Sequence, residues 1–352
     1  SETAVAGTTS AGNVATLNRV ILPVIRRVMP TVIANELLGV QPMTGPVGQI
    51  HTLRVRYSDT AGTGASGATA GEEALSPFKI AEAYSGNTTT GKADNTAVLE
   101  GAAGNKLSIQ ILKQTVEAKT RKLSARWTFE AAQDAQSMHG IDVEAEIMAA
   151  LAQEITAEID QEVIASLNTL AGSAGQTYDQ AAVSGTATFV GDEHAALAVQ
   201  INRVSNQIAQ RTRRGAGNWA VVSPFALTIL QSATTSAFAR TTEGSFEAPT
   251  NTKMVGTLNN AMKVYVNTYA ADNANVLVGY KGSSESDAAA FYCPYIPLMS
   301  SGVVLDPSTF EPTVSFMTRY GYIELSNTAS SLGNAADYLG AVAITSGNVT
   351  FS

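Results

Sequence analysis

An apolar residue recurs at every fourth position from Ile147 to Leu167 of this 352-residue chain. The surrounding stretch, from about Ile141 to Leu170, contains no Pro or Gly, so it predicts one uninterrupted helix about 45 Å long. Three acids, Glu154, Glu158 and Glu162, also recur at four and lie on a separate face. This helix is the strongest single element in the sequence.

Charge is divided unevenly along the chain, whose formal net charge is -8. The stretch from Trp127 to Asn202 holds twelve of the 30 acids and no Lys or Arg, so the remainder holds 18 acids against all 22 bases. An acidic balance argues against general affinity for DNA or RNA. The segregation has two readings: an acidic region that meets a basic region of this chain or of another copy, or a solvated helix face.

Residues 58–105 contain little to bury, because they are rich in Gly, Ser, Thr and Ala. A structureless stretch of that length is improbable inside a compact domain. Strands are expected on either side: "SIQILKQ" alternates, and "HTLRVRY" places Leu53, Val55 and Tyr57 on the buried face of a half-buried strand, with its arginines on the other. We therefore expect a two-stranded arm that projects from the body and is ordered by a neighbour.

Other patterns complete an α+β reading. Apolar spacing predicts a helix from Val14 to Leu38, interrupted by Pro23 and Pro30. "KLSARWTF" alternates as a strand. A second long helix begins with Asp192 as its cap and ends in "QRTRRG". "NWAVVSP" predicts a buried strand that leads into a helix at Pro224, and "MKVYVN", "NVLVGY" and "TVSFMTRYGYIEL" predict further strands.

The stretch "GNTTTGKA", Gly86 to Ala93, departs at one position from the phosphate-binding loop G-x-x-x-x-G-K-[ST]. A true phosphate loop joins a buried strand to a helix. Neither the stretch before Gly86 nor the stretch after Lys92 has this character, and Ala93 lacks the hydroxyl that would bind magnesium. We interpret the stretch as part of the arm, with Lys92 contacting an acid of a neighbouring copy, and keep a P-loop NTPase as the remote alternative.

No other enzyme signature stands out. Asp192, Glu193 and His194 are better explained by a helix start than by a metal site, and the Glu154/Glu158 pair lacks the Glu-x-x-His partner of a metal-binding bundle. Arg211, Arg213 and Arg214 could contact phosphates, but helix-end cations or an interface patch is the favoured reading. We expect no catalytic, cofactor or metal site.

The single cysteine, Cys293, excludes an internal disulfide and is interpreted as a small core residue. No apolar run reaches the length of about 18 residues that spans a bilayer. The chain starts at Ser1 with no basic-then-apolar leader. That start has two explanations, removal of the initiator methionine or proteolytic maturation.

Several long blocks resemble the mature major capsid proteins of T-even-like myoviruses, in the same order and from Arg26 to Gly321. These blocks are "RRVMPTVIANELLGVQPMTGPVGQIHTLRVRY", "EAAQDAQSMHGIDVEAEIMAALAQEITAEIDQEVI", "INRVSNQIAQRTRRGAGNWAVVSP", "KVYVNTYA", "VLVGYKG", "DAAAFYCPYIPL" and "DPSTFEPTVSFMTRYG".

The resemblance implies the tailed-phage capsid fold of Hong Kong 97 type. Its parts would be an N-terminal arm and first strand (1–57), an extended loop (58–120), a peripheral domain with the spine helix (121–191), an axial domain (192–305), and a return to the peripheral domain with a C-terminal tail (306–352). It further implies hexamers, with pentamers left open, that form an icosahedral head around double-stranded DNA. In this family a prohead protease removes an N-terminal segment, which the Ser1 start fits.

The implied partners are other copies of the chain, vertex and decoration or cement proteins, and packaged DNA contacted without sequence preference. The implied location is the virion, assembled in the host bacterial cytoplasm, with no membrane contact. We expect the spine acids Glu154, Glu158 and Glu162 to meet the arm cations of a neighbour, Arg19, Arg26 and Arg27. A non-viral compartment shell of the same fold is the other alternative.

Overall fold

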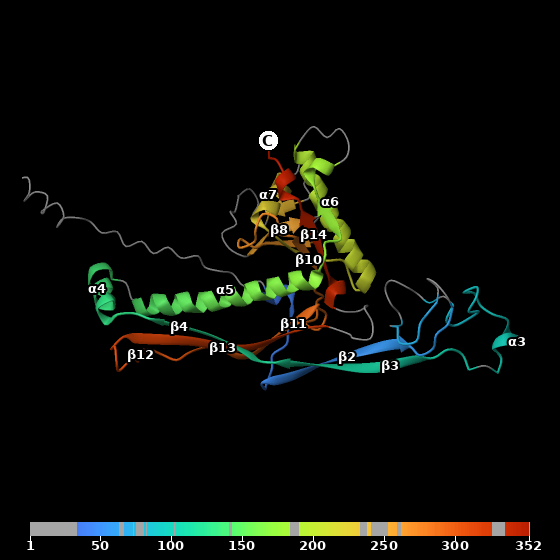
Figure 1. Ribbon diagram of the computed structural model, residues 1–352, viewed down its shortest axis with the longest axis horizontal. Helices are drawn as coiled ribbons and strands as arrows, with labels where there is room; N and C mark the ends of the chain where they lie inside the picture. The colour runs from blue at the N-terminus through green and yellow to red at the C-terminus, as the bar shows by residue number, and fades with distance from the viewer. Residues whose placement is uncertain are drawn as a thin grey trace, which may run out of the picture.

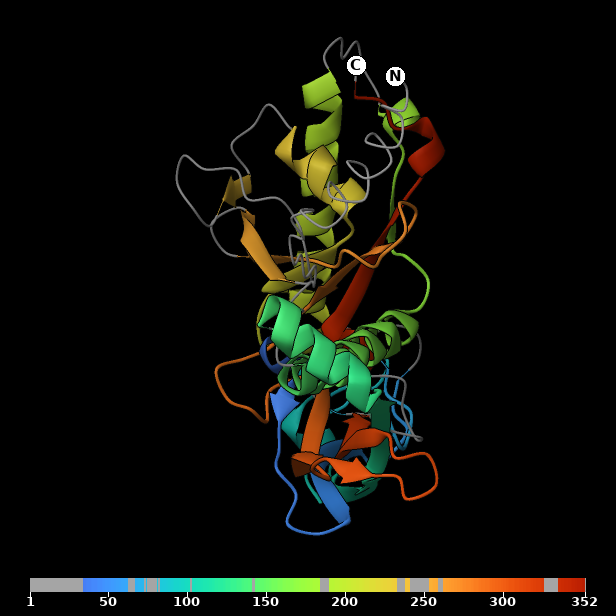
Figure 2. The same cartoon turned by 90° about the vertical axis from the view of Figure 1, so that its left-hand side faces the viewer.

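The computed structural model describes residues 34–62, 67–72, 74, 81, 83–101, 103–140, 143–183, 190–232, 238–240, 253–258, 262–325 and 335–351. This part of the chain is an elongated lower layer with a domain standing on it (Figure 1). Viewed along the long axis, the longest helix separates the upper domain from the strands below it (Figure 2).

The longest helix, α5 (Val143–Ala171), confirms the prediction from the four-residue repeat. Its 29 residues span about 44 Å. One end packs Leu151, Ile155 and Ile159 on the lower sheet. The other end packs Val163, Ile164 and Leu167 under the upper domain. The single apolar stripe therefore joins the two parts of the molecule.

The lower sheet has five strands, in the order β1-β11-β13-β12, with β4 paired to β13. Their bounds are β1 Gly39–Val40, β4 Lys119–Arg126, β11 Ala290–Ser300, β12 Val304–Leu305 and β13 Pro312–Glu324. Alternate residues of β13, Val314, Phe316 and Tyr320, meet the spine helix. The helix α4 (Phe129–His139) follows β4, so the strand predicted through Phe129 ends three residues earlier than expected.

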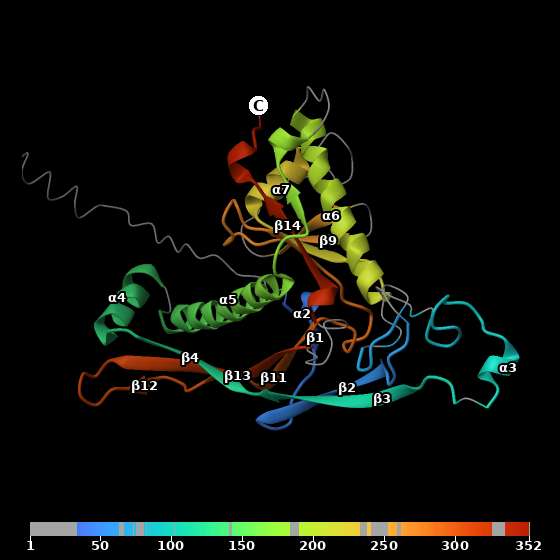
Figure 3. The same ribbon diagram turned by 45° about the vertical axis from the view of Figure 1, so that its right-hand side comes forward.

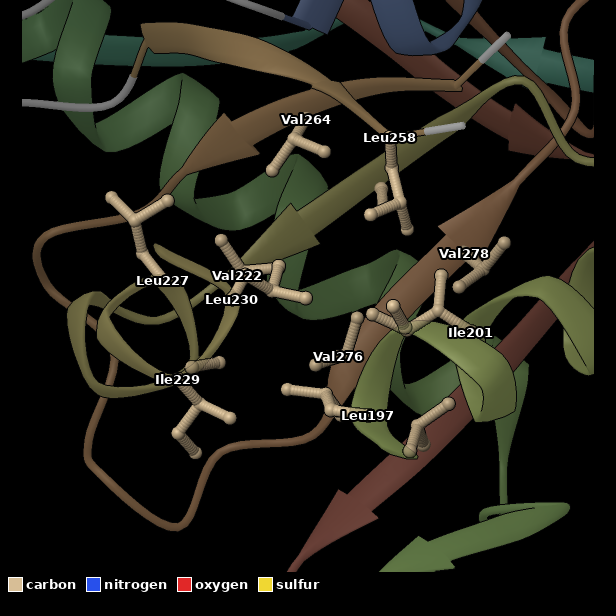
Figure 4. Packing of buried hydrophobic residues seen from close by; sticks show 14 of the residues in the cluster. Leu197, Ile201, Val222, Leu227, Ile229, Leu230, Leu258, Val264, Val276 and Val278 are labelled. Atoms are coloured by element: carbon tan, nitrogen blue, oxygen red, sulfur yellow. The ribbon is translucent and has the colours of Figure 1, made fainter. Parts of the chain in front are cut away.

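The upper domain contains a seven-stranded sheet in the order β5-β14-β10-β6-β9-β8-β7. The bounds are β5 Gln176–Tyr178, β6 Trp219–Val222, β7 Phe238–Arg240, β8 Lys253–Leu258, β9 Met262–Val266, β10 Val276–Gly279 and β14 Leu339–Ile344. Helices α6 (Val190–Thr212) and α7 (Pro224–Gln231) share one core with one face of this sheet (Figure 4). The spine helix covers the other face, so the central strands are apolar on both sides.

The predicted passage from strand to helix at "NWAVVSP" is confirmed. All four residues of β6 are buried. The Ser223 hydroxyl accepts a hydrogen bond from the backbone N–H of Ala226 at 3.2 Å, and Pro224 opens the helix, so two favourable terminal residues fix where α7 begins.

A two-stranded ribbon, β2 (Val47–Tyr57) paired with β3 (Leu107–Glu117), extends from the lower layer (Figure 3). The two strands keep one unbroken antiparallel register from Val47↔Glu117 to Tyr57↔Leu107. The short helix α3 (Thr96–Leu99) lies at the far end of this ribbon. The remaining short elements are α2 Ala34–Leu37, η2 Gln180–Ala182, η3 Ala335–Tyr338 and η4 Ser346–Asn348.

The end of the chain divides between the two sheets, whereas we expected 306–352 to return to the peripheral domain. β13 lies in the lower sheet, but β14 pairs with β10 and β5 in the upper sheet. Five of the six residues of β14 are buried, a pattern that suits a strand covered by helices on both faces. Of the helix predicted from Val14 to Leu38, only α2 falls within the described residues.

Candidate assembly surfaces

The ribbon exposes its apolar face. Leu53 pairs with Ile111, and Leu107 and Ile109 lie on the same face of β3; we call these four residues the outer row. Leu53 is 65% exposed and Ile109 70%. An isolated two-stranded ribbon is marginal in water, and contiguous exposed apolar side chains mark an interaction surface.

On β2 the opposite face is the more buried one, so the expected orientation of "HTLRVRY" is wrong. Arg54 and Arg56 are buried, whereas Leu53 points to solvent. The prediction assumes that apolar residues face the core of the single chain. That assumption fails where a face is left for contact with another molecule.

The base of the ribbon is fixed to the body. Val116 is buried with Phe291 and Cys293, and Met43 packs against them. The Gln114 side-chain amide donates to the backbone carbonyl of Glu324 at 3.1 Å. The outer row therefore lies on an arm whose root is held in place.

The described residues between β2 and β3 form a small module, the arm tip. Ala61, Ala68, Ala81 and Tyr84 are buried together, and the ring of Tyr84 lies 4.5 Å from that of Tyr57. The Tyr84 hydroxyl also donates to the backbone carbonyl of Lys106. Alanines and one tyrosine thus make a very small core, as the composition of this stretch requires.

The stretch Gly86–Ala93 is a closed turn in this module. The Asn87 side-chain oxygen accepts the backbone N–H groups of Thr89 and Thr90 at 2.9 and 3.0 Å. Gly91 has φ +70°, and a Cβ on Gly86 would lie 2.5 Å from the carbonyl oxygen of Lys92. The backbone amides of Asn87, Thr89, Thr90 and Gly91 are therefore occupied within the turn. In the described residues no strand leads directly into the turn, and the next element along the chain is the four-residue α3.

Two of the three spine acids are bound within the chain. Arg121 on β4 contacts the Glu158 carboxylate at 3.1 Å and that of Glu162 at 2.7 Å. The Tyr320 hydroxyl also donates to Glu162. Burial would raise the pKa of Glu162, but the hydrogen bonds from Tyr320 and Arg121 outweigh it and hold that pKa below its usual value.

Glu154 has a different environment. Its pKa is raised, chiefly because its carboxyl shares a hydrogen bond with Glu158 and secondarily because of burial. The arm residues expected to meet these acids, Arg19, Arg26 and Arg27, lie outside the described residues. Their contact with the spine of a neighbour stays a prediction.

The three arginines at the end of α6 lie in different environments. Arg211 lies in the last turn of the helix, and Arg213 follows it with φ +52°. Arg214 makes an ion pair with Asp287 at 3.0 Å. These positions fit helix-end cations, and the expected role of the three arginines between subunits stays a prediction, as does that of Lys92, which is exposed on the arm tip.

His194 and Cys293 are both structural. The ring of His194 is fully buried and contacts the Ser232 hydroxyl, the Gln180 side-chain carbonyl and the Thr350 carbonyl. Cys293 is buried in an apolar cluster, which raises the pKa of its thiol.

Within the residues that the structure describes, no cluster of three potential ligands could hold a metal ion. In that same part, no helix has the length and apolarity to cross a bilayer.

Arg121 and Tyr320 were missed in the sequence. The signal was available, because Arg121 shares the alternating face of β4 with Leu123 and Ala125, the residues that pack toward the spine helix. A charged residue at an inward position of a strand calls for a buried partner of opposite charge.

The fold has known counterparts among virus shells. A chain from Microbacterium phage Oxtober96 superposes with a TM-score of 0.56 at 12% identity, over 95% of this chain and 98% of that one. The capsid of Myoviridae phage XM1 gives 0.54 at 11% identity, over 93% and 97%. A projecting ribbon, a spine helix and a separate sheet domain in this arrangement define the tailed-phage capsid fold of Hong Kong 97 type, which confirms the expected fold class.

The family model described as major capsid protein Gp23 matches residues 14–344. The major capsid protein of Vibrio phage KVP40 is 30% identical over 93% of this chain and 80% of its own length. That of Enterobacteria phage T4 is 30% identical over 90% and 76%. The chain belongs to the Gp23 family of major capsid proteins. It is a structural protein of the virion capsid that assembles with copies of itself, and not an enzyme.

Proposed function

We propose that copies of this chain assemble into hexamers, and into pentamers where the shell curves, to form an icosahedral head around double-stranded DNA. The outer row of the ribbon carries this proposal. Fully burying one Leu or Ile side chain contributes about 1.5–3 kcal/mol. An exposed ion pair contributes about 0–1 kcal/mol, so the four apolar side chains would dominate the contact between neighbours.

The two sheets suggest the working parts of the subunit. The peripheral domain would comprise the lower sheet, α4 and the first half of the spine helix. The axial domain would comprise the upper sheet with α6 and α7, and would include β5 and β14. The ribbon and arm tip would form the extended loop.

Charge would refine the contacts within the shell. We infer that the N-terminal cations Arg19, Arg26 and Arg27 reach the spine acids of a neighbour, with Glu154 the favoured target because Glu158 and Glu162 already bind Arg121. The net charge of -8 limits the contact with packaged DNA to weak, non-specific patches. Vertex and decoration proteins would occupy positions that this subunit leaves open.

The test is to replace Ile109 with Asp and image the particles formed with the complete set of head proteins. We expect closed shells from the unchanged chain and none, or very few, from the variant. Gln110→Asp is the matched control, because the neighbouring side chain points to the other face of the same strand. Normal shells from the Ile109→Asp chain would contradict the proposal.

A further inference from the structure

The last residues that the structure describes, 345–351, follow β14 and form a segment that we call the C-terminal strap. The strap lies at the far end of the upper domain, beside α6 and α7 (Figure 1). Val349 packs against the core that these helices share with the sheet. The ring of Phe351 lies 5.6 Å from that of Phe225 on α7. The strap therefore covers this end of the apolar core.

A buried glutamine holds the strap in place. The Gln180 side-chain carbonyl accepts the backbone N–H of Thr350 at 2.9 Å, and the Gln180 amide donates to the Thr350 hydroxyl at 3.2 Å. The Asn348 side-chain amide donates to the Asp179 carboxylate at 2.9 Å. Gln180 is only 5% exposed, so its bonds to the strap are shielded from water.

The strap also closes over the ring of His194, which is fully buried. The Nε2 atom lies 3.0 Å from the Thr350 carbonyl oxygen and 3.2 Å from the Gln180 side-chain oxygen. Both of these oxygens are acceptors, so Nε2 carries the proton of the neutral ring. The Nδ1 atom then accepts the hydroxyl proton of Ser232, and the Phe351 ring lies edge-on at 5.4 Å. Among the described residues, every polar group in contact with the ring is uncharged.

The acids nearest to His194 are bound elsewhere. The Glu193 carboxylate accepts the Gln180 amide at 2.6 Å, and the Asp179 carboxylate accepts the Asn348 amide. Neither α7 nor the strap contains a titratable side chain. The titratable groups on the elements packed around the ring are Asp192 and Glu193 of α6, and Tyr178 and Asp179 beside η2.

A proton added to this ring would create a buried cation without a counter-ion in contact. Hydrogen bonding does not oppose it, because the Ser232 hydroxyl lies 3.0 Å from the Ile229 carbonyl and is able to turn to that acceptor. The loss of water around the charge does oppose it. Burial lowers the pKa of His194 by more than the Thr350 hydrogen bond and the charge of Glu193 raise it. Opening the strap would return the charged ring to water.

We propose that the C-terminal strap is an acid-sensitive latch, which closes over neutral His194 and opens when this ring takes up a proton. Because the pKa of His194 is lower in the closed state, closure is fully favoured above the exposed value of about 6.5 and is weakened as the pH falls below it. The latch is a property of the single subunit, so it goes beyond the proposed assembly function and does not depend on it.

Thiol reactivity in free subunits tests the latch. Val349→Cys places a thiol where the strap packs on the core, and its reaction with dithiodipyridine is followed at pH 7.5 and pH 5.5. Each rate is divided by that of Ala271→Cys, at an exposed position of the upper domain, measured at the same pH. This ratio removes the pH dependence of the thiol chemistry itself. The native Cys293, buried in the lower layer, reports unfolding of the whole subunit.

We expect the ratio to rise about tenfold from pH 7.5 to pH 5.5, because an exposed imidazole gains its proton near 6.5 and the buried ring does not. Cys293 should stay unreactive at both pH values. A ratio that does not change would overturn the latch. A rise that Cys293 shares would also overturn it, because the strap would then open only with the whole subunit.

A matched variant assigns the effect to one ring. His194→Gln removes the titration but keeps an amide that is able to donate to the Thr350 carbonyl, so the ratio should be the same at both pH values. A full rise in this variant would overturn the assignment. NMR titration of the unchanged chain gives a second measurement that needs no variant. The histidine ring in contact with Phe351 should titrate below about 6.5, and a midpoint at or above this value would contradict the latch.

Discussion

The upper sheet and the ribbon are built from the same kinds of residue but use them in opposite ways. In β10, Val276, Leu277 and Val278 are completely or almost completely buried between helices. In β3, Leu107, Ile109 and Ile111 are all more than half exposed. A strand rich in β-branched or aliphatic residues thus indicates that its surface will be buried in a contact. It does not indicate whether that contact is with the same chain or with another one.

The largest difference in stability between the two regions is expected from the same Ile→Ala substitution made in each. Ile201→Ala removes a fully buried side chain from the core in Figure 4 and should destabilise the free subunit by about 2–5 kcal/mol. Ile109→Ala should change the stability of the free subunit by no more than about 0.5 kcal/mol, because the side chain is exposed. Denaturant unfolding of the unassembled chain measures both. Equal losses would show that the ribbon folds against its own body.

Adding a methyl group at a glycine should produce a smaller difference in stability between the two regions. A Cβ on Gly279 would lie 2.1 Å from the Trp219 ring, so Gly279→Ala should cost about 1–3 kcal/mol. Gly86→Ala creates a similar clash with the carbonyl of Lys92, but inside the small arm tip. We expect it to disturb that turn and leave the melting of the upper domain unchanged. A global loss from Gly86→Ala would mean that the arm tip is coupled to the core.

The smallest expected effect on stability is electrostatic, and it concerns Glu162 on the spine helix. The pKa of Glu162 is held low by Tyr320 and Arg121. A carboxyl whose pKa falls on folding contributes stability above its unfolded value of about 4.3, and this is lost as the pH drops through the lower folded value. Because the group is about half exposed, we expect no more than about 1 kcal/mol. Glu162→Gln should flatten the difference in melting temperature between pH 6 and pH 3.

Much of the fold follows from local patterns. The spine helix, the strand and helix around Ser223, and the strands β9, β10 and β13 are each specified by their own residues. The assignment of each strand to the upper or the lower sheet is harder to predict from the sequence. For example, β14 enters the upper sheet because it pairs with β10 and β5, which are far away in sequence. Its apolar character is visible in the sequence, but the identity of its neighbours is not.

The assembly surfaces were harder to predict for a different physical reason. The alternation of "HTLRVRY" defines two faces but assigns neither to the core, and the arginine face turned out to be the buried one. The spine acids were found by spacing, whereas their partner Arg121 required the three-dimensional pairing of β4 with β13.

The central claim is that the outer row of the ribbon is a surface reserved for another subunit. The most direct test is the maleimide labelling rate of Ile109→Cys, measured in free subunits and in assembled shells. Ala271→Cys, at an exposed position of the upper domain, is the reference. We predict fast labelling at both positions in the free subunit, and a marked loss at position 109 alone after assembly. Equal labelling of position 109 before and after assembly would contradict the account.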